Sequence, residues 1–77
     1  MSEDIKDKSE VVRAFAVEID EVVEMCSEIP PAGRDFSAGV RTRLGKMRAW
    51  AVEHDHVTEK MEEALANMRE GVEKWLP

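Results

Sequence analysis

The chain has 77 residues, of which 43% are hydrophobic and 36% charged, and its formal net charge is −6. A chain of this length forms one small domain that buries only about 60% of the surface exposed on unfolding, so we expect assembly to complete its core. The composition is too apolar for a disordered tail, and no apolar run is long enough to span a membrane. The acidic start of the chain and its single Cys26 favour a cytoplasmic location.

The net charge is divided unevenly along the chain. Residues 1–31 carry nine acidic and three basic side chains, residues 32–52 carry one acidic and five basic ones, and residues 53–77 carry seven acidic and three basic ones. A basic segment between two acidic ones favours pairing of oppositely charged helices, within one chain or between two. Direct nucleic-acid binding is disfavoured, because no Tyr or Phe is interleaved with the basic residues of segment 41–48 and the overall negative charge repels phosphate.

A first helix is predicted over about residues 9–29. Apolar residues recur there at intervals of three and four, at Val12, Phe15, Ile19, Val22, Cys26 and Ile29. Four more, Val11, Ala16, Val23 and Met25, widen this face so that it can touch two neighbouring helices. We expect Ser9 or Ser2 to cap the helix, and Pro30-Pro31 to end it because the residue before a proline avoids the helical conformation.

A Pro/Gly turn over residues 30–34 separates this helix from a second one over about 35–54. Asp35 or Ser37 is expected to cap the second helix by accepting a hydrogen bond from a first-turn amide. Its apolar face is predicted to contain Phe36, Val40, Leu44, Met47 and Ala51.

Small residues form another strip on the second helix, roughly opposite the apolar face. Arg41 and Arg48 flank it on one side and Lys46 on the other. Small side chains let a partner helix approach closely, although Ala is also ordinary solvent-facing filler. Gly39 and Gly45 favour a packing role, since each costs about 0.5 to 1 kcal/mol relative to Ala within a helix. With Trp50 as an aromatic anchor, the predicted partner-binding residues are Ala38, Arg41, Thr42, Gly45, Arg48, Ala49 and Trp50.

A third helix is predicted over about 58–76, with Thr58 as its N-cap. Its apolar residues are Val57, Met61, Leu65, Met68, Val72 and Trp75. A short turn makes the second and third helices antiparallel, which puts Trp50 and Trp75 at opposite ends of the hairpin. Residues 1–77 are thus expected to form a single all-α domain, a small antiparallel three-helix bundle completed by dimerisation.

The hairpin of residues 36–76 resembles helical hairpins of small phage and mobile-element accessory proteins. The residues that carry the resemblance are Phe36, Val40, Leu44, Trp50, Val57-Thr58-Glu59-Lys60, Ala64-Leu65, Met68, Gly71-Val72 and Lys74-Trp75. This sequence departs from the pattern at Asp55, where glycine is usual, and at Met61, where glutamine is usual. The resemblance implies an accessory role and brings no catalytic residue with it.

His54 and His56 are the candidate metal ligands, but residues two apart on a helix point in different directions and zinc needs further ligands. The competing interpretation is a polar turn in which Asp55 or His56 takes the left-handed conformation and ends the second helix. Cys26 lies on an apolar face and is predicted to be a core residue. We therefore expect no metal, no cofactor and no enzymatic activity.

The sequence favours a small, non-catalytic protein-interaction module that self-associates as a homodimer and binds a protein partner of unknown identity. The alternative is an acidic phage-type inhibitor that mimics nucleic acid and blocks a host nucleic-acid enzyme. Nine carboxylates before residue 29 suggest this second function.

Overall fold

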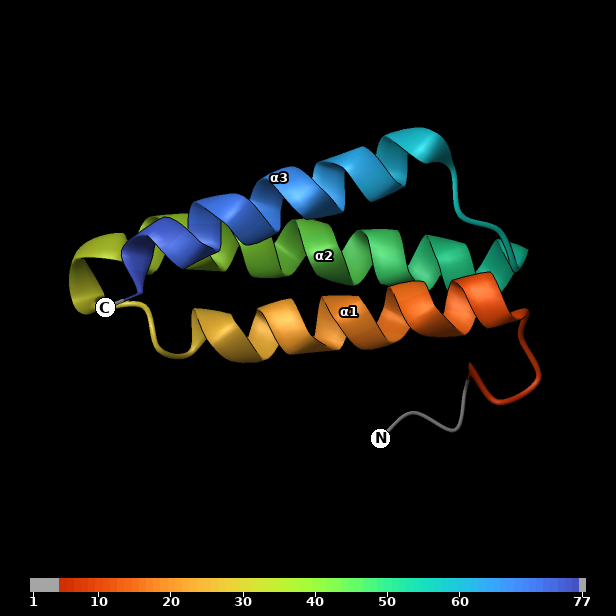
Figure 1. Cartoon of the computed structure of the whole chain (residues 1–77). Coiled ribbons are helices and arrows are strands. Elements are labelled where there is room, and N and C mark those ends of the chain that lie inside the picture. Colours follow the sequence, from red (N-terminus) through yellow and green to blue (C-terminus); the bar gives the residue numbers. More distant parts are fainter. Residues whose placement is uncertain (1–4, 77) are drawn as a thin grey trace.

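A computed structural model describes residues 5–76 of the chain, in which three α-helices lie side by side (Figure 1). The helices are α1 (Glu10–Cys26), α2 (Arg34–His54) and α3 (Glu59–Trp75), and a short 3-10 helix, η2 (Pro31–Gly33), precedes α2. Each helix runs opposite to the one before it, so α1 and α3 point the same way (Figure 1). The predicted all-α architecture of three antiparallel helices is confirmed.

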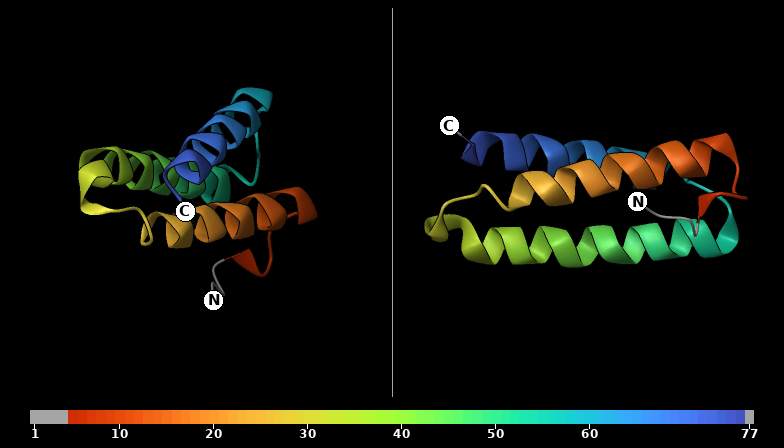
Figure 2. Two further views of the ribbon diagram at one scale, coloured as in Figure 1. Left: turned by 60° about the vertical axis from the view of Figure 1, so that its left-hand side comes forward. Right: turned by 90° about the horizontal axis from the view of Figure 1, so that it is seen from below.

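The core is built around α1. Its six buried residues are Val12, Phe15, Ala16, Ile19, Val22 and Cys26. Four of them, Phe15, Ile19, Val22 and Cys26, form one core cluster with Val40, Leu44 and Ala51 of α2 and with Leu65 and Val72 of α3. Helix α1 contacts both other helices, whereas α2 and α3 contact each other least (Figure 2). This confirms that the apolar face of α1 is wide enough for two neighbours.

The boundaries of α1 follow the predicted signals closely. The Ser9 hydroxyl accepts a hydrogen bond from the Val12 amide at 3.3 Å and caps the helix, while Ser2 lies outside the described residues. The helix ends at Cys26, and residues 27–29 form a turn before the two prolines. In that turn the Ser27 hydroxyl donates to the Glu24 carbonyl at 2.7 Å.

The start of α2 differs from the prediction, because neither Asp35 nor Ser37 caps it. Pro31 opens the 3-10 turn, in which the Gly33 amide donates to the Pro30 carbonyl at 2.8 Å. This turn continues directly into α2, so no side-chain cap is formed at Gly33. Ser37 is instead buried, and its hydroxyl donates to the Cys26 carbonyl at 3.4 Å, which ties the start of α2 to the end of α1.

The connection between α2 and α3 has the predicted conformation. Asp55 takes the left-handed conformation with φ of 49° and ends α2. The Thr58 hydroxyl accepts from the Met61 amide at 3.1 Å and caps α3. The Asp55 carboxylate also accepts from the Ser9 amide at 2.9 Å, which joins this turn to the start of α1.

Two glycines permit close packing at the end of the molecule where α2 begins. A Cβ on Gly71 of α3 would lie 3.0 Å from Cζ of Phe36, and a Cβ on Gly33 would lie 2.6 Å from Cγ2 of Ile29. The rings of Phe36 and Trp75 lie at this end with centroids 6.2 Å apart, whereas Trp50 lies near the α2–α3 connection. The predicted separation of the two indoles is therefore confirmed.

The space around Gly33, Gly39 and Gly45 predicts how an added methyl group changes the free energy of unfolding. Gly39→Ala and Gly45→Ala should each raise the free energy of unfolding by about 0.5 to 1 kcal/mol, because an added Cβ meets nothing within 4 Å and Ala favours the helix. Gly33→Ala should lower it by about 1 to 3 kcal/mol through overlap with Ile29. Urea denaturation at low protein concentration measures all three values, and equal effects at all three glycines would contradict the packing described above.

Candidate protein-interaction surface

The predicted strip of small residues lies on a side of α2 that nothing in the described part of the chain covers. Its members, Ala38, Thr42, Gly45 and Ala49, are all exposed. Val40, Leu44 and Ala51 are buried on the side that faces the core. The strip is therefore a low surface of small side chains, and its shape suits the backbone of an approaching helix better than a small molecule.

The arginines that flank the strip have different surroundings. The Arg48 guanidinium donates to both carboxylate oxygens of Asp20 on α1, at 3.0 Å and 3.3 Å, and its side chain is only 18% exposed. Arg48 thus helps to hold α1 against α2. Because most of its side chain is buried there, it offers little surface to a partner at the strip. Arg41 is exposed and forms no ion pair with any residue between 5 and 76, and the same is true of Arg43 and Lys46.

Trp50 lies on a different side of α2 from the centre of the strip, roughly a third of the way around the helix. Its side chain faces the groove between α2 and α3, where it lines a hollow of about 380 Å³ with Lys46, Met47, Thr58 and Met61. Residue Trp50 as a whole remains 39% exposed. The structure therefore separates the aromatic anchor from the small residues, with Lys46 between them.

The two histidines pack around the indole of Trp50. The His54 ring stacks on it with centroids 4.1 Å apart, and the His56 ring lies edge-on at 6.2 Å. The ring nitrogen Nδ1 of His54 lies 2.9 Å from the Trp50 carbonyl oxygen. Among residues 5–76, no three His, Cys, Asp or Glu side chains come together as a metal-binding group, so these histidines lack the further ligands that zinc requires.

Cys26 is buried at the end of α1, as predicted for a core residue. Burial raises the pKa of its thiol above the ordinary value of 9.0, while the hydrogen bond with Ser37 and the charge of Arg41 act in the opposite direction. A raised pKa keeps the thiol neutral at physiological pH, so the geometry provides no reactive thiolate.

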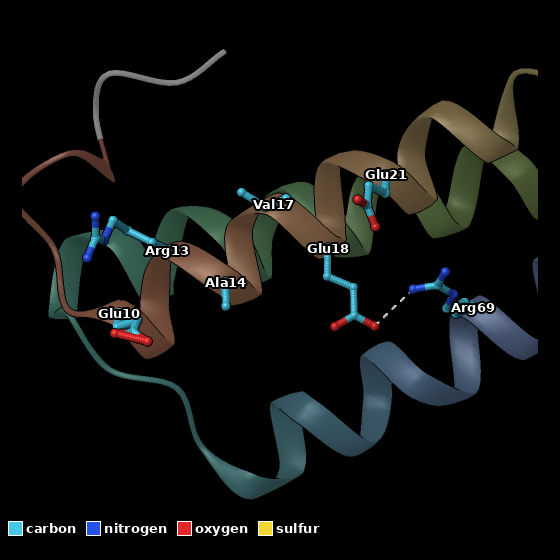
Figure 3. A pocket seen from close by; sticks show the side chains of 7 residues that line it. All are labelled: Glu10, Arg13, Ala14, Val17, Glu18, Glu21 and Arg69. Carbon is cyan, nitrogen blue, oxygen red and sulfur yellow. Dashed lines mark hydrogen bonds and ion pairs between the residues drawn. The ribbon is translucent and has the colours of Figure 1, made fainter.

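A second surface, which the sequence interpretation missed, lies on the outer side of α1 (Figure 3). The side chains of Glu10, Ala14, Val17 and Glu21 line it, and Glu18 forms an ion pair with Arg69 of α3 at 3.3 Å. Val11 was expected to widen the core face of α1, but it is 58% exposed, and Val17 is 46% exposed. Their places in the sequence explain this, because successive residues turn by about 100° and both valines fall outside the arc of the six buried residues.

The chain matches no protein-family model, no curated protein and no solved structure. The resemblance of residues 36–76 to phage-type helical hairpins therefore stays a prediction. No helix within residues 5–76 has both the length and the apolar character that crossing a bilayer demands.

The raised pKa of Cys26 predicts a pH dependence of stability. The folded chain should hold its full stability below pH 9.0, the ordinary pKa, and lose stability as pH rises through the higher pKa of the buried thiol. The chain contains no Tyr, which removes one other group that titrates in this range. We expect the free energy of unfolding of the wild type to fall more steeply above pH 9.0 than that of Cys26→Ala, and parallel curves would contradict this prediction.

Proposed function

We propose that this chain is a non-catalytic protein-interaction module that self-associates through the exposed side of α2. The observation that carries the proposal is the uncovered strip of small residues, bordered by Arg41 on one side and Lys46 on the other, neither of which forms an ion pair between residues 5 and 76. A buried, neutral Cys26 is compatible with a cytoplasmic location. The hairpin resemblance supports an accessory role of the phage or mobile-element type.

The shape of the strip supports a helical partner. A surface of Ala38, Thr42, Gly45 and Ala49 allows two helix axes to approach more closely than the 8 to 10 Å that is typical for larger side chains. Such an approach buries main-chain and small apolar atoms over the length of several turns. The bordering cations would set the orientation of the partner, because like charges reject a basic surface and opposite charges accept an acidic one.

Bulky polar residues in the strip should block this contact. We expect Gly45→Gln with Ala49→Gln to weaken self-association at least tenfold, because both positions are exposed and glutamine is a good helix former that does not fit a close contact. Sedimentation equilibrium at micromolar concentration measures the association, and circular dichroism measures the fold.

The control for this pair of changes is Gly45→Ala, which adds one methyl group that meets nothing within 4 Å. It should leave the association close to that of the wild type. A wild-type chain that stays a compact monomer at these concentrations would overturn the proposal. If the glutamine variant associates like the wild type, the strip is not the surface of self-association.

The second candidate function is an acidic inhibitor that mimics nucleic acid, and the exposed carboxylates of Glu10, Glu21, Glu24 and Glu28 on and just beyond α1 favour it. Two observations make it second. Arg13 lies among these carboxylates, and Asp20 and Glu18 are already paired with Arg48 and Arg69.

An inhibitor of this kind should bind a nucleic-acid enzyme in competition with duplex DNA or RNA. Binding should also weaken steeply as salt rises, because it would rest on opposite charges. Competition assays with DNA-binding and RNA-binding enzymes at two salt concentrations test this function, and absence of competition would exclude it for those enzymes.

A further inference from the structure

Exposed apolar side chains occur on two separate surfaces of the chain with different charged surroundings. The large hydrophobic residues that are exposed within residues 5–76 are Val11, Val17, Trp50 and Trp75. Trp75 is accounted for by its contact with Phe36. The other three are not covered by the fold, and they lie on α1 and on α2.

The surface on α1 is a ridge of apolar side chains with one carboxylate at each end. We call Glu10, Val11, Ala14, Val17 and Glu21 the α1 ridge, and all five are exposed. Arg13 and Glu18 lie beside the ridge, and Glu18 is paired with Arg69 (Figure 3). Glu10 and Glu21 therefore leave the ridge with a net negative charge even with Arg13 counted. Glu10 and Glu21 form no ion pair with any described residue, so both are available to a cation from outside the chain.

The surface on α2 combines small residues, one aromatic ring and cations. We call Gly39, Thr42, Lys46, Ala49 and Trp50 the α2 face, and all five are exposed. The intervals from Gly39 to Ala49 are three, four and three residues, and Trp50 follows Lys46 by four, so the face extends from the small-residue strip across Lys46 to Trp50 at the groove beside α3. Arg43 and Lys46 are unpaired with residues 5–76, and the hollow beside Trp50 and Met61 gives the face a recess.

We infer that the α2 face binds the α1 ridge of a second copy of this chain. This inference rests on the proposed function, since it names the partner surface in self-association. The charges are complementary, because the cations of one surface meet the carboxylates of the other. Both surfaces also offer apolar area to the contact. Val11 and Val17 are exposed on the ridge, and the α2 face presents small side chains beside the indole of Trp50.

The lengths of the two surfaces agree. Glu10 to Glu21 and Gly39 to Trp50 each span about 16 Å at the rise of an α-helix. A stable interface buries about 800 Å² on each partner. The rest of such an interface has to come from residues next to the two helix faces. On α3, Met61 lies beside Trp50, and Glu62 and Ala66 lie beside Glu18, so these residues would add to the contact.

Reversing the charge of one surface at a time tests the inference. Variant A carries Arg43→Glu and Lys46→Glu on α2, and variant B carries Glu10→Lys and Glu21→Lys on α1. Each variant alone should associate at least tenfold more weakly than the wild type, because like charges then meet across the contact. An equimolar mixture of A and B should recover association to within about threefold of the wild type, because the unchanged α1 ridge of A meets the unchanged α2 face of B and the two reversed surfaces are again opposite in charge.

The mixture is informative because general charge attraction does not explain its recovery. Each replacement changes the net charge by two, so the wild-type value of −6 becomes more negative in A and stays negative in B. The control for A is Arg34→Glu with Lys74→Glu, and the control for B is Glu63→Lys with Glu70→Lys. All four control positions are exposed and lie outside both surfaces, so both controls should associate like the wild type.

Sedimentation velocity of each variant and of the mixture gives the association constants, and thermal unfolding followed by circular dichroism shows that each variant is folded. Wild-type association by either variant alone, or a mixture as dissociated as its components, would overturn the assignment of the α1 ridge. If the Gly45→Gln, Ala49→Gln variant is nevertheless weakened in self-association, α2 remains the interaction surface and contacts a surface of the second copy other than the α1 ridge. If sedimentation shows that the wild type is a monomer, both the proposed self-association and the assignment of the α1 ridge are wrong.

Discussion

The structure depends on the burial of one wide apolar face of α1 between two other helices. Val12, Ile19 and Val22 are fully enclosed there, and each such side chain contributes about 1.5 to 3 kcal/mol relative to exposure. Helices α2 and α3 contact each other much less, so they are held together chiefly through α1. Loss of that face would leave a hairpin in which the Phe36 ring packs against Gly71.

This arrangement determines which surfaces remain for a partner. Because α1 takes most of the packing, α2 uses only a narrow arc of its circumference in the core and exposes the rest. The same division applies to charge. Arg48 completes an ion pair with Asp20 inside the molecule, while Arg41, Arg43 and Lys46 are left unpaired among the described residues. One basic residue of α2, Arg48, therefore stabilises the packing of the helices, whereas Arg41, Arg43 and Lys46 are exposed to solvent.

The local features of this fold were predictable, whereas the features that depend on how helices meet were not. Ser9, Thr58 and Asp55 occupy the caps that short-range chemistry indicates, since a cap needs only its neighbours in sequence. The side-chain cap predicted for α2 was wrong, because Pro31 opens a 3-10 turn at its first position and Ser37 donates to a distant carbonyl on α1.

The candidate surfaces show the same limit. Helical periodicity placed Ala38, Thr42, Gly45 and Ala49 on one exposed strip, but it gave no sign that Arg48 pairs with a carboxylate 28 residues away. The exposure of Val11 was also not predicted, because the sequence alone does not show whether an apolar residue at the edge of a helix face is buried or exposed. Both outcomes depend on the direction in which α1 faces its neighbours, which is a property of the assembled bundle.

The hydrogen bond from the Ser9 amide to the Asp55 carboxylate joins positions 46 residues apart. Ser9 is the cap of α1, and Asp55 is the residue that ends α2. This hydrogen bond therefore couples fraying of the first turn of α1 to opening of the α2–α3 connection, since either event breaks it. Local order at the start of α1 and in that connection should change together.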